Sequence, residues 1–319
     1  MRYLRWAMIL GVFLGCAGVS AGAADSGTAE RDTKALVQFQ CEAIERVYYD
    51  PAMGRRLCRQ LRAAQRSGEL AALPARDRLK RVTALLRETS GDVHFYAGPV
   101  VKAAKADTPD ADDKAEPETN WNGGITQVRV LPPNVGYIRW DRHLADDVAF
   151  ARIISALELL EGVDALIFDL TGNPGGDGRA SGFVNRHLFA DDDYQDLLVK
   201  RCTGETEWKR SEVPYNHAPG PKFPQTPVYV MVSEDTGSAA EYFAFIVQQM
   251  KRATVLGSTT AGAGNPVTMV SNDAYFAYVP ICQIQTRDGA SIERQGVVPD
   301  VVLRSDDWLA ETLEYVLAQ

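Results

Sequence analysis

The chain has little of what several classes of protein require. Among 319 residues there are only four histidines and five cysteines, so we predict no metal cluster. No long basic run is present and the net charge is −8 at pH 7, which argues against a phosphate-backbone partner such as DNA or RNA. With 45% hydrophobic and 24% charged residues, the composition is typical of a globular protein with one large or two modest domains.

Long apolar runs are also missing after the N-terminus, so we expect no integral membrane segment in the mature chain. Residues 1–24 have the layout of a secretory signal peptide, with a basic start and an apolar run over 7–18. Cleavage after Ala23 or Ala24 would make the protein periplasmic or secreted. One alternative stays open, because the residues around Cys16 weakly resemble a lipoprotein cleavage box.

Three segments follow the signal peptide. Apolar residues within 31–89 repeat every three to four positions, and we interpret 25–102 as a helical cap domain. Residues 103–120 are rich in acidic residues and have no aromatic residue, which predicts an acidic linker or mobile loop. Residues 121–319 form the third segment, an α/β core domain.

Strands and helices alternate in the core domain, which predicts an α/β fold with a largely parallel sheet and helices outside it. The expected strands are 135–140, 165–170, 228–232 and 254–257, and the expected helices are 148–160, 239–251 and 308–318. A hairpin is expected around the Asn272-Asp273 turn.

Four cysteines remain after the signal peptide, and none of them forms a C-x-x-C pair. An even number in an exported chain allows two disulfides, with three connectivities open. Because Cys41 and Cys58 lie on neighbouring expected helices, we favour Cys41–Cys58 with Cys202–Cys282. Free buried thiols are the alternative.

The best single clue to chemistry is the sequence Asp-Thr-Gly-Ser-Ala-Ala-Glu at 235–241, between a buried strand and a helix. Ser238 falls at the helix N-terminus, where free N–H groups and the helix dipole favour negative charge. A serine there can act as a nucleophile, with the N–H of Ala239 binding the oxyanion. The plain alternative is that Ser238 only caps the helix.

A second clue is the glycine-rich loop Thr-Gly-Asn-Pro-Gly-Gly at 171–176, which follows the buried strand 165–170. The carboxyl ends of parallel strands are where open α/β sheets place their sites. The loop lacks the spacing of a phosphate-binding loop. It is therefore either a ligand-facing backbone segment or a tight turn.

Histidine is the usual base for a serine nucleophile, and His94, at the end of the helical region, is our candidate. Its competitors are His143, His187 and His217. Glu293 is the candidate acid that would orient the histidine. Taken alone, a histidine such as His94 is more often a structural or surface residue, and Glu293 more often an exposed carboxylate of a turn.

Together, and in this order, these motifs resemble the tail-specific, or C-terminal processing, peptidase family of serine proteases. The resemblance lies between residues 135 and 300, in the stretches VGYIRW, ALIFDLTGNPGG, VYVMVSEDTGSAAEYFA, KRATVLGSTTAG and IERQGVVPD. The helical region ending in Asp-Val-His looks like the cap of the branch that includes the tricorn core protease and the interphotoreceptor retinoid-binding protein repeats. The resemblance implies a crotonase-like α/β core with a mixed, largely parallel sheet and a helical cap.

The resemblance also implies the roles of the site residues. If this chain follows the tricorn-like branch, Ser238 would be the nucleophile, His94 the base and Glu293 the acid that orients the histidine. The oxyanion hole would combine the glycine loop with the helix start, namely Gly175 or Gly176 with the N–H of Ala239. The site would lie in the cleft between cap and core, and no cofactor is implied.

Two departures from the processing-peptidase branch limit this inference. That branch pairs its serine with a downstream lysine, but Ala263 stands at the lysine position here, which rules out a Ser–Lys dyad there. The span between His94 and residue 121 is also too short for a PDZ module, so selection of C-termini by such a module is not expected.

Two functions from different classes follow. The leading hypothesis is an exported serine endopeptidase that hydrolyses peptide bonds in peptide or protein substrates through a Ser-His-Glu triad. The alternative is a non-catalytic binding protein for apolar ligands or peptides on the same scaffold. The sequence leaves the oligomeric state and the substrate preference open.

Overall fold

The computed structural model describes residues 22–100, 122–211 and 218–319. The expected acidic linker, the candidate His217 and nearly all of the expected signal peptide lie outside the described residues. In the described part, no helix combines the length and the apolar character needed to cross a membrane.

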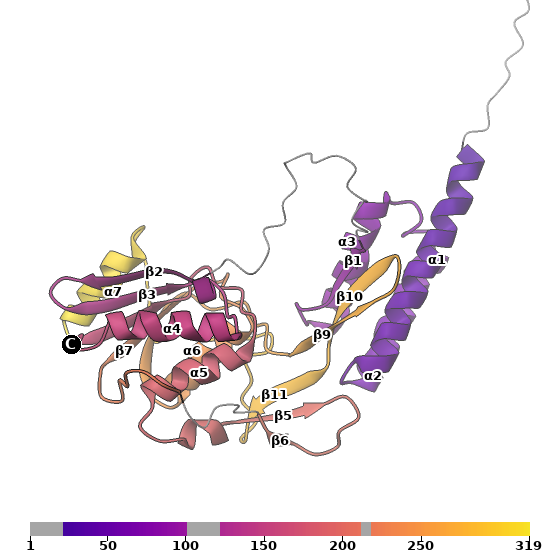
Figure 1. Cartoon of the computed structure of the whole chain (residues 1–319). Helices are drawn as coiled ribbons and strands as arrows, with labels where there is room; N and C mark the ends of the chain where they lie inside the picture. Colours follow the sequence, from indigo (N-terminus) through magenta and orange to yellow (C-terminus); the bar gives the residue numbers. More distant parts are fainter. Residues whose placement is uncertain (1–21, 101–121, 212–217) are drawn as a thin grey trace, which may run out of the picture.

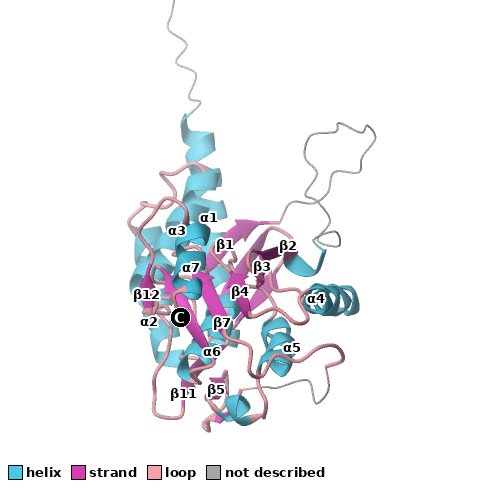
Figure 2. Cartoon of the chain, turned by 90° about the vertical axis from the view of Figure 1, so that its left-hand side faces the viewer, coloured by secondary structure: helices cyan, strands magenta, loops and turns pink. Residues whose placement is uncertain are grey.

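Six strands form the central sheet of the larger part of the molecule (Figures 1 and 2). They are β2 (Ile125–Leu131), which follows a short turn η2 (Asn122–Gly124), β3 (Val135–Trp140), β4 (Ala165–Asp169), β7 (Val228–Val232), β8 (Ala253–Gly257) and β12 (Val301–Val302). In the order β12-β8-β7-β4-β3-β2 all neighbours are parallel except β2, which is antiparallel to β3. The predicted largely parallel sheet is confirmed.

Helices cover both faces of this sheet. Alternate residues of a strand point to opposite faces, so a strand that is apolar throughout needs a covering layer on each side. The helices are α4 (Asp147–Leu159), α5 (Gly178–Leu188), α6 (Ala239–Gln249) and α7 (Trp308–Leu317). Leu166 and Phe168 of β4 join the core formed with α4, α5 and α6, whereas Ala165 and Ile167 join the core that includes Val316 of α7. Both faces are thus buried at the centre of the sheet, which explains why β4 and β7 are almost entirely apolar.

The cap is built from two distant parts of the chain. Its helices are α1 (Gly22–Val47), α2 (Pro51–Arg66) and α3 (Ala75–Ser90), and its strands are β1 (Tyr96–Pro99), β9 (Val267–Ser271) and β10 (Tyr275–Pro280). The strands pair antiparallel in the order β1-β10-β9, and Val270, Ala277 and Val279 share one core with the helices.

The expected hairpin around Asn272 therefore exists, but it packs with the cap rather than with the core domain to which 121–319 was assigned. The physical reason is that the apolar faces of the three cap helices need a further surface against which to bury themselves.

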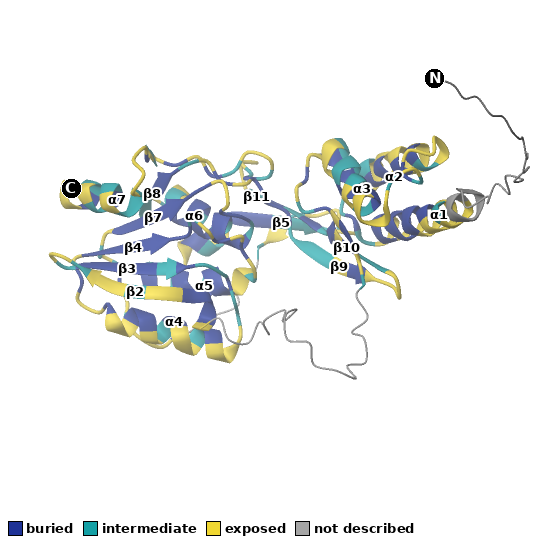
Figure 3. Ribbon diagram, turned by 90° about the horizontal axis from the view of Figure 1, so that it is seen from above, coloured by how far each residue is buried: buried dark blue, intermediate teal, exposed yellow. Residues whose placement is uncertain are grey.

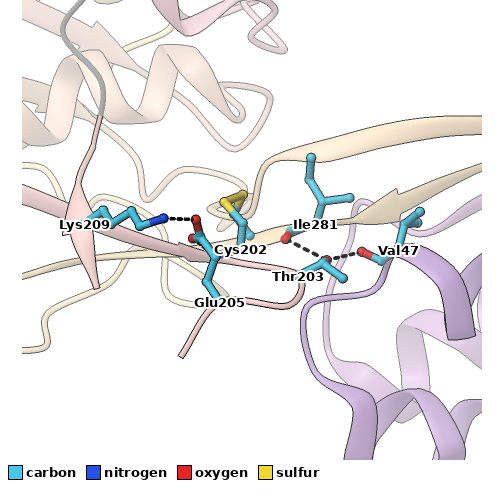
Figure 4. The surroundings of a disulfide bond; sticks show 7 residues. Val47, Cys202, Thr203, Glu205, Lys209 and Ile281 are labelled. Carbon is cyan, nitrogen blue, oxygen red and sulfur yellow. Dashed lines mark hydrogen bonds and ion pairs between the residues drawn. A yellow bond between two sulfur atoms is a disulfide. The ribbon is translucent and has the colours of Figure 1, made fainter. Parts of the chain in front are cut away.

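A small sheet lies between the two parts (Figure 3). It contains β5 (Leu198–Cys202), which follows the turn η3 (Asp193–Asp196), β6 (Lys209–Arg210) and β11 (Cys282–Thr286). Cys202 and Cys282 face each other across β5 and β11 and form a disulfide. Next to it, the Thr203 hydroxyl lies between the carbonyl oxygens of Val47 in the cap and Ile281 (Figure 4).

The predicted Cys202–Cys282 disulfide is confirmed, whereas the predicted Cys41–Cys58 disulfide is wrong for this structure. Both thiols are free and buried, Cys41 in α1 and Cys58 in α2. Adjacent helices thus bring the two sulfur atoms together without a covalent bond.

Loss of the disulfide should destabilise the protein. The bond closes a loop across 80 residues, so the variant Cys202→Ser/Cys282→Ser should lose about 2–4 kcal/mol of unfolding free energy. Denaturant unfolding measures this. Wild-type protein unfolded in excess dithiothreitol is the control and should match the variant; equal stability of wild type and variant without reductant would contradict the expectation.

Candidate active site

Ser238 lies in the turn between the carboxyl end of β7 and the start of α6. Its φ of 52° and ψ of −119° fall in a region that non-glycine residues rarely adopt, whereas an ordinary N-cap residue is extended. Such backbone strain persists only where the surroundings enforce it, and it is concentrated at functional sites. The turn therefore differs from that of a serine that only caps a helix.

Glu241, three residues after Ser238, fixes this turn. Its carboxylate is fully buried and accepts a hydrogen bond of 2.8 Å from the Ser238 N–H. Its other donors all come from residues 260–263, namely the Thr260 hydroxyl (2.5 Å) and the N–H groups of Gly262 (2.7 Å) and Ala263 (2.8 Å). One carboxylate thus ties the serine turn to the segment that contains Ala263.

The glycine loop lies directly against the serine turn. A Cβ atom on Gly175 would be 2.8 Å from the Ser238 Cβ and 3.0 Å from the Ala239 nitrogen, so only glycine fits. The N–H of Gly175 donates to Asn173 Oδ1 at 2.8 Å and is therefore already used. Over the described ranges, the N–H groups of Gly176 and Ala239 form no hydrogen bond, which leaves this pair as available donors.

His94 lies in the loop between α3 and β1 and is held by Asp92. The His94 Nδ1 is 3.2 Å from Asp92 Oδ1, which also accepts the His94 backbone N–H at 2.9 Å. Asp92 Oδ2 accepts from Asn265 Nδ2 at 2.9 Å. Burial opposes ionisation of Asp92, but the hydrogen bonds from His94 and Asn265 outweigh it and lower the pKa of this carboxyl. Asp92 is therefore a charged, fixed partner for the imidazole.

Glu293 lies in the same group of residues. Its Oε2 accepts the Gly264 N–H at 2.9 Å, and its Oε1 is buried without a hydrogen-bond partner in the described structure. Burial, reinforced by the nearby charge of Asp92, raises the pKa of Glu293 to about 7. The ring of His94 is bonded to Asp92 and not to Glu293, so the acid at Nδ1 differs from the one that the sequence suggested.

The serine turn and the His94 group are attached to consecutive residues of one segment. Ala263 donates to Glu241, Gly264 donates to Glu293, and Asn265 donates to Asp92. His94 Nε2 is buried and has no hydrogen-bond partner among the residues described, so the Ser238–His94 hydrogen bond is not formed here. Catalytic hydrogen bonds are often loose without substrate and tighten when it binds.

The raised pKa of Glu293 predicts a pH-dependent stability. A carboxyl whose pKa rises from 4.5 to about 7 on folding stabilises the folded state at low pH, and this contribution is lost as the pH rises through 7. The glutamine of Glu293→Gln does not ionise. The free energy of unfolding of this variant, measured relative to wild type, should therefore be about 2 kcal/mol more favourable at pH 8 than at pH 5. Denaturant unfolding at both pH values measures the difference.

The control for this measurement is the exposed carboxylate Glu161. Glu161→Gln should show the same stability difference from wild type at both pH values, because solvent screens an exposed charge. A Glu293→Gln variant that gains nothing at pH 8 would contradict the burial argument.

Comparison with known proteins decides which family this site belongs to. The model of Peptidase family S41 matches residues 134–303, which is more than half of the chain. The chain belongs to peptidase family S41. The matched range begins just before β3 and includes the glycine loop, Ser238 and Glu293, whereas His94 and Asp92 lie before it.

Curated relatives in this family align with about half of the chain. The carboxyl-terminal-processing protease of Synechocystis sp. is 29% identical over 174 residues, which cover 53% of this chain and 38% of that protein. The chloroplastic C-terminal processing peptidase of Tetradesmus obliquus is 30% identical over 179 residues, which cover 54% of this chain and 37% of that protein. The chain thus spans well under half the length of these relatives.

Solved structures share the S41 fold over most of the chain. A putative peptidase from Parabacteroides merdae has a TM-score of 0.60 at 15% identity and covers 91% of this chain and 96% of that one. The tricorn protease has a TM-score of 0.57 at 12% identity and covers 92% of this chain and 37% of that one. At these identities the likeness concerns the fold alone.

Within the S41 core, the competing histidines have structural positions. His143 is buried, stacks on Trp140 with ring centroids 3.8 Å apart, and contacts Asn173. Burial lowers its pKa to about 3, so it stays neutral and supports the glycine loop. His187 is buried in α5 against the carbonyl oxygen of Pro221, and burial lowers its pKa to about 4.

Asp92 and Asn265 are the site residues that the sequence reasoning missed. The only local signal for Asp92 was its position two residues before His94, a spacing at which an aspartate can accept the backbone N–H of the residue that it orients. Asn265 gave no such signal, because it lies 173 residues from its partner in the sequence.

Asp92, His94 and Glu293 also form the one group of potential metal ligands in the described ranges. Their ligand atoms lie within 4.8 Å of one another. A metal held there would occupy the imidazole that a serine mechanism needs as a base, so the two uses of this group exclude each other.

Proposed function

We propose that this S41 chain is a serine-type peptidase that cleaves peptide bonds in peptide or protein substrates by acyl transfer. The observation that carries the proposal is the strained turn at Ser238, which packs against Gly175 of the glycine loop, together with the unused N–H groups of Gly176 and Ala239. In the proposed reaction these two N–H groups would donate to the oxyanion of the tetrahedral intermediate formed at Ser238. A simple N-cap would need neither the strain nor the second donor.

The proposed mechanism follows from the roles of these groups. His94 Nε2 takes the proton of the Ser238 hydroxyl as the oxygen attacks the substrate carbonyl, and the same proton passes to the leaving amine. Water then attacks the acyl-serine and gives a proton to His94, which passes it to the Ser238 oxygen as the acyl–oxygen bond breaks and the carboxyl product leaves. Asp92 holds the ring through Nδ1 and stabilises the imidazolium, while Glu293 adds a second carboxyl that can neutralise it.

The relatives support a peptidase of this kind. Their names describe carboxyl-terminal-processing proteases, and the part of the chain that aligns with them carries the serine turn and the glycine loop. Because the histidine and its aspartate lie outside the matched range, we propose that the base comes from the cap, so the site depends on how cap and core dock.

We also propose that the protein is exported through its N-terminal signal sequence. The Cys202–Cys282 disulfide supports this, because such bonds persist in oxidising compartments and are rare in the cytosol. The intact mass of protein recovered after export tests the proposal. A mature N-terminus at Ala24 or Asp25 is expected, and retention of residues 1–23 would contradict it.

A fluorophosphonate probe tests the proposed activity directly. The activated Ser238 should be labelled, and digestion followed by mass spectrometry should place the adduct on the peptide that contains it. The free Nε2 of His94 favours the second candidate, a binding protein without chemistry. In that case the probe would leave Ser238 unlabelled, also in the presence of peptides.

A further inference from the structure

A cavity of about 370 Å³ lies beside the proposed nucleophile. Ala239, directly after Ser238, lines it, as do Asp177 and Gly178, which directly follow the oxyanion glycine Gly176. Most of the other lining residues come from α5, α6, β5, β11 and the turn η3, and Ser211, Pro266 and Ile281 lie directly next to strands. A side chain next to a carbonyl held at Ser238 would therefore point at this cavity or its rim.

Much of the wall of the cavity is apolar, and two buried polar groups in it lack partners. Apolar lining comes from Leu198, Ile246, Pro266, Ile281, Ile284 and the Cys282 end of the disulfide. Asn185 of α5 lines the cavity with 1% of its surface exposed, and neither its Oδ1 nor its Nδ2 has a hydrogen-bond partner in the described residues. The hydroxyl of Tyr194, 3% exposed, is likewise unpartnered.

Two unpaired atoms of one amide restrict what can fill the cavity. A substrate side chain that packs against Asn185 has to bond to both Nδ2 and Oδ1 or leave a buried polar group unsatisfied. A carboxylate only accepts, an ammonium only donates, and an apolar side chain does neither. A second amide both donates and accepts and so matches Asn185 and the Tyr194 hydroxyl.

The charged residues that line the cavity do not change the preference for an amide side chain. Asp177 and Arg179 pair with each other at 2.6 Å, and their side chains are 37% and 52% exposed, so they lie at the solvent side of the cavity. Lys200 also lines the cavity and has interactions of its own. An acidic substrate side chain is the competitor that these cations would favour, and the experiment has to separate it from the amide.

We propose that this cavity binds an uncharged, amide-bearing substrate side chain with an apolar stem, such as glutamine, at the residue whose carbonyl Ser238 attacks. As a statement about cleavage preference, this inference rests on the proposed peptidase function. The recognition itself depends only on the cavity, Asn185 and Tyr194.

The test uses three side chains of nearly equal length that differ at the end. Acetyl-Ala-Ala-X coumarylamides with X as Gln, Glu or Met are compared by kcat/KM. Wild-type protein should prefer Gln to Met and to Glu by about tenfold or more, because the wrong end group leaves the buried amide unpaired. A preference for Met or Glu would overturn the inference.

Two variants of the cavity test whether its polar groups cause the preference. Asn185→Leu replaces the amide by an apolar group of similar size and should bring Gln and Met within about threefold of each other. Tyr194→Phe removes one oxygen atom and should weaken the preference for Gln in part. Tyr194→Phe also serves as the second test should Asn185→Leu not fold, and an unchanged preference in the folded variants would overturn the assignment.

Gln40 provides a matched control. Its side-chain amide is also fully buried without hydrogen-bond partners, but it lies in α1 of the cap and does not line the cavity. Gln40→Met should leave the ratio of Gln to Met cleavage unchanged. A change as large as that of Asn185→Leu would show that buried amides act through general stability and not through this cavity.

Binding separates failure of this inference from failure of the proposed function. Acetyl-Ala-Ala-X amides are titrated by calorimetry into Ser238→Ala, which retains the cavity. If no coumarylamide is hydrolysed but Gln still binds at least about tenfold more tightly than Met, the peptidase proposal fails and the cavity assignment stands. If the coumarylamides are hydrolysed without a preference for Gln, the peptidase proposal stands and the cavity assignment fails. Equal binding of the three amides would also overturn the cavity assignment.

Discussion

Ser238→Ala should lose peptide hydrolysis by about 10⁴-fold or more in kcat while the protein remains folded. Removal of a nucleophile in a triad abolishes covalent catalysis and leaves only the contribution of binding and the oxyanion donors. Loss of the hydroxyl as a cap costs only about 1 kcal/mol. Steady-state assays with fluorogenic peptides, together with thermal unfolding, measure both effects.

Ser258 is the matched control for this variant. It follows the parallel strand β8, and its hydroxyl contacts Glu234 at 3.1 Å. Ser258→Ala should retain wild-type activity. Hydrolysis by Ser238→Ala within about threefold of wild type would exclude Ser238 as the nucleophile.

Stability of a glycine variant tests the strain at the same position. Ser238→Gly should unfold at a higher temperature than Ser238→Ala, because glycine adopts a φ of 52° without a Cβ penalty. Equal stability of the two variants would show that the turn is not strained, and the argument that separates Ser238 from an ordinary cap would be lost.

His94→Ala should reduce kcat to a similar extent as Ser238→Ala, since no other imidazole is placed to act as the base in the described part of the site. Asp92→Asn should reduce kcat by about 10²–10⁴-fold, because the amide no longer holds the required tautomer or stabilises the imidazolium. Glu293→Gln should be less damaging than Asp92→Asn, because Asp92 is the acid bonded to Nδ1.

The pH profile of kcat distinguishes a positioning role of Asp92 from a structural one. Loss of a carboxylate that stabilises the imidazolium should change the acid limb of the profile, whereas loss of a purely structural contact should leave the shape of the profile unchanged. Unfolding measurements on the same variant separate this from loss of fold. If Glu293→Gln were the more damaging variant, the acid inferred from the resemblance would be the orienting one and the arrangement seen here would be a resting state.

Much of the core could be predicted from local patterns. The apolar runs at 165–170 and 228–232 indicated buried parallel strands, and β4 and β7 lie there. The strand-turn-helix around Ser238 could be placed for the same reason, since a buried strand, a short polar turn and an amphipathic helix each follow from neighbouring residues.

The cap, and the part of the site that holds the proposed base His94, could be predicted only in part. The helices of 31–89 follow from apolar periodicity, but the pairing of β1 with β10 joins residues far apart in sequence and leaves no local pattern. The same holds for Cys41 and Cys58, whose proximity could be predicted from neighbouring helices while the absence of a bond between them could not.

The sequence by itself determined the identity of the chemical groups: a serine at a helix start, a glycine loop at the end of a parallel strand, one histidine near the cap, and no lysine at position 263. The tertiary structure decided which of these groups meet, because a hydrogen bond depends on distance and direction and not on order along the chain. In the structure, His94 is bonded to Asp92 and the N–H of Gly175 donates to Asn173. Residues 260–265 donate hydrogen bonds to Glu241 of the serine turn and to the carboxylates of Glu293 and Asp92.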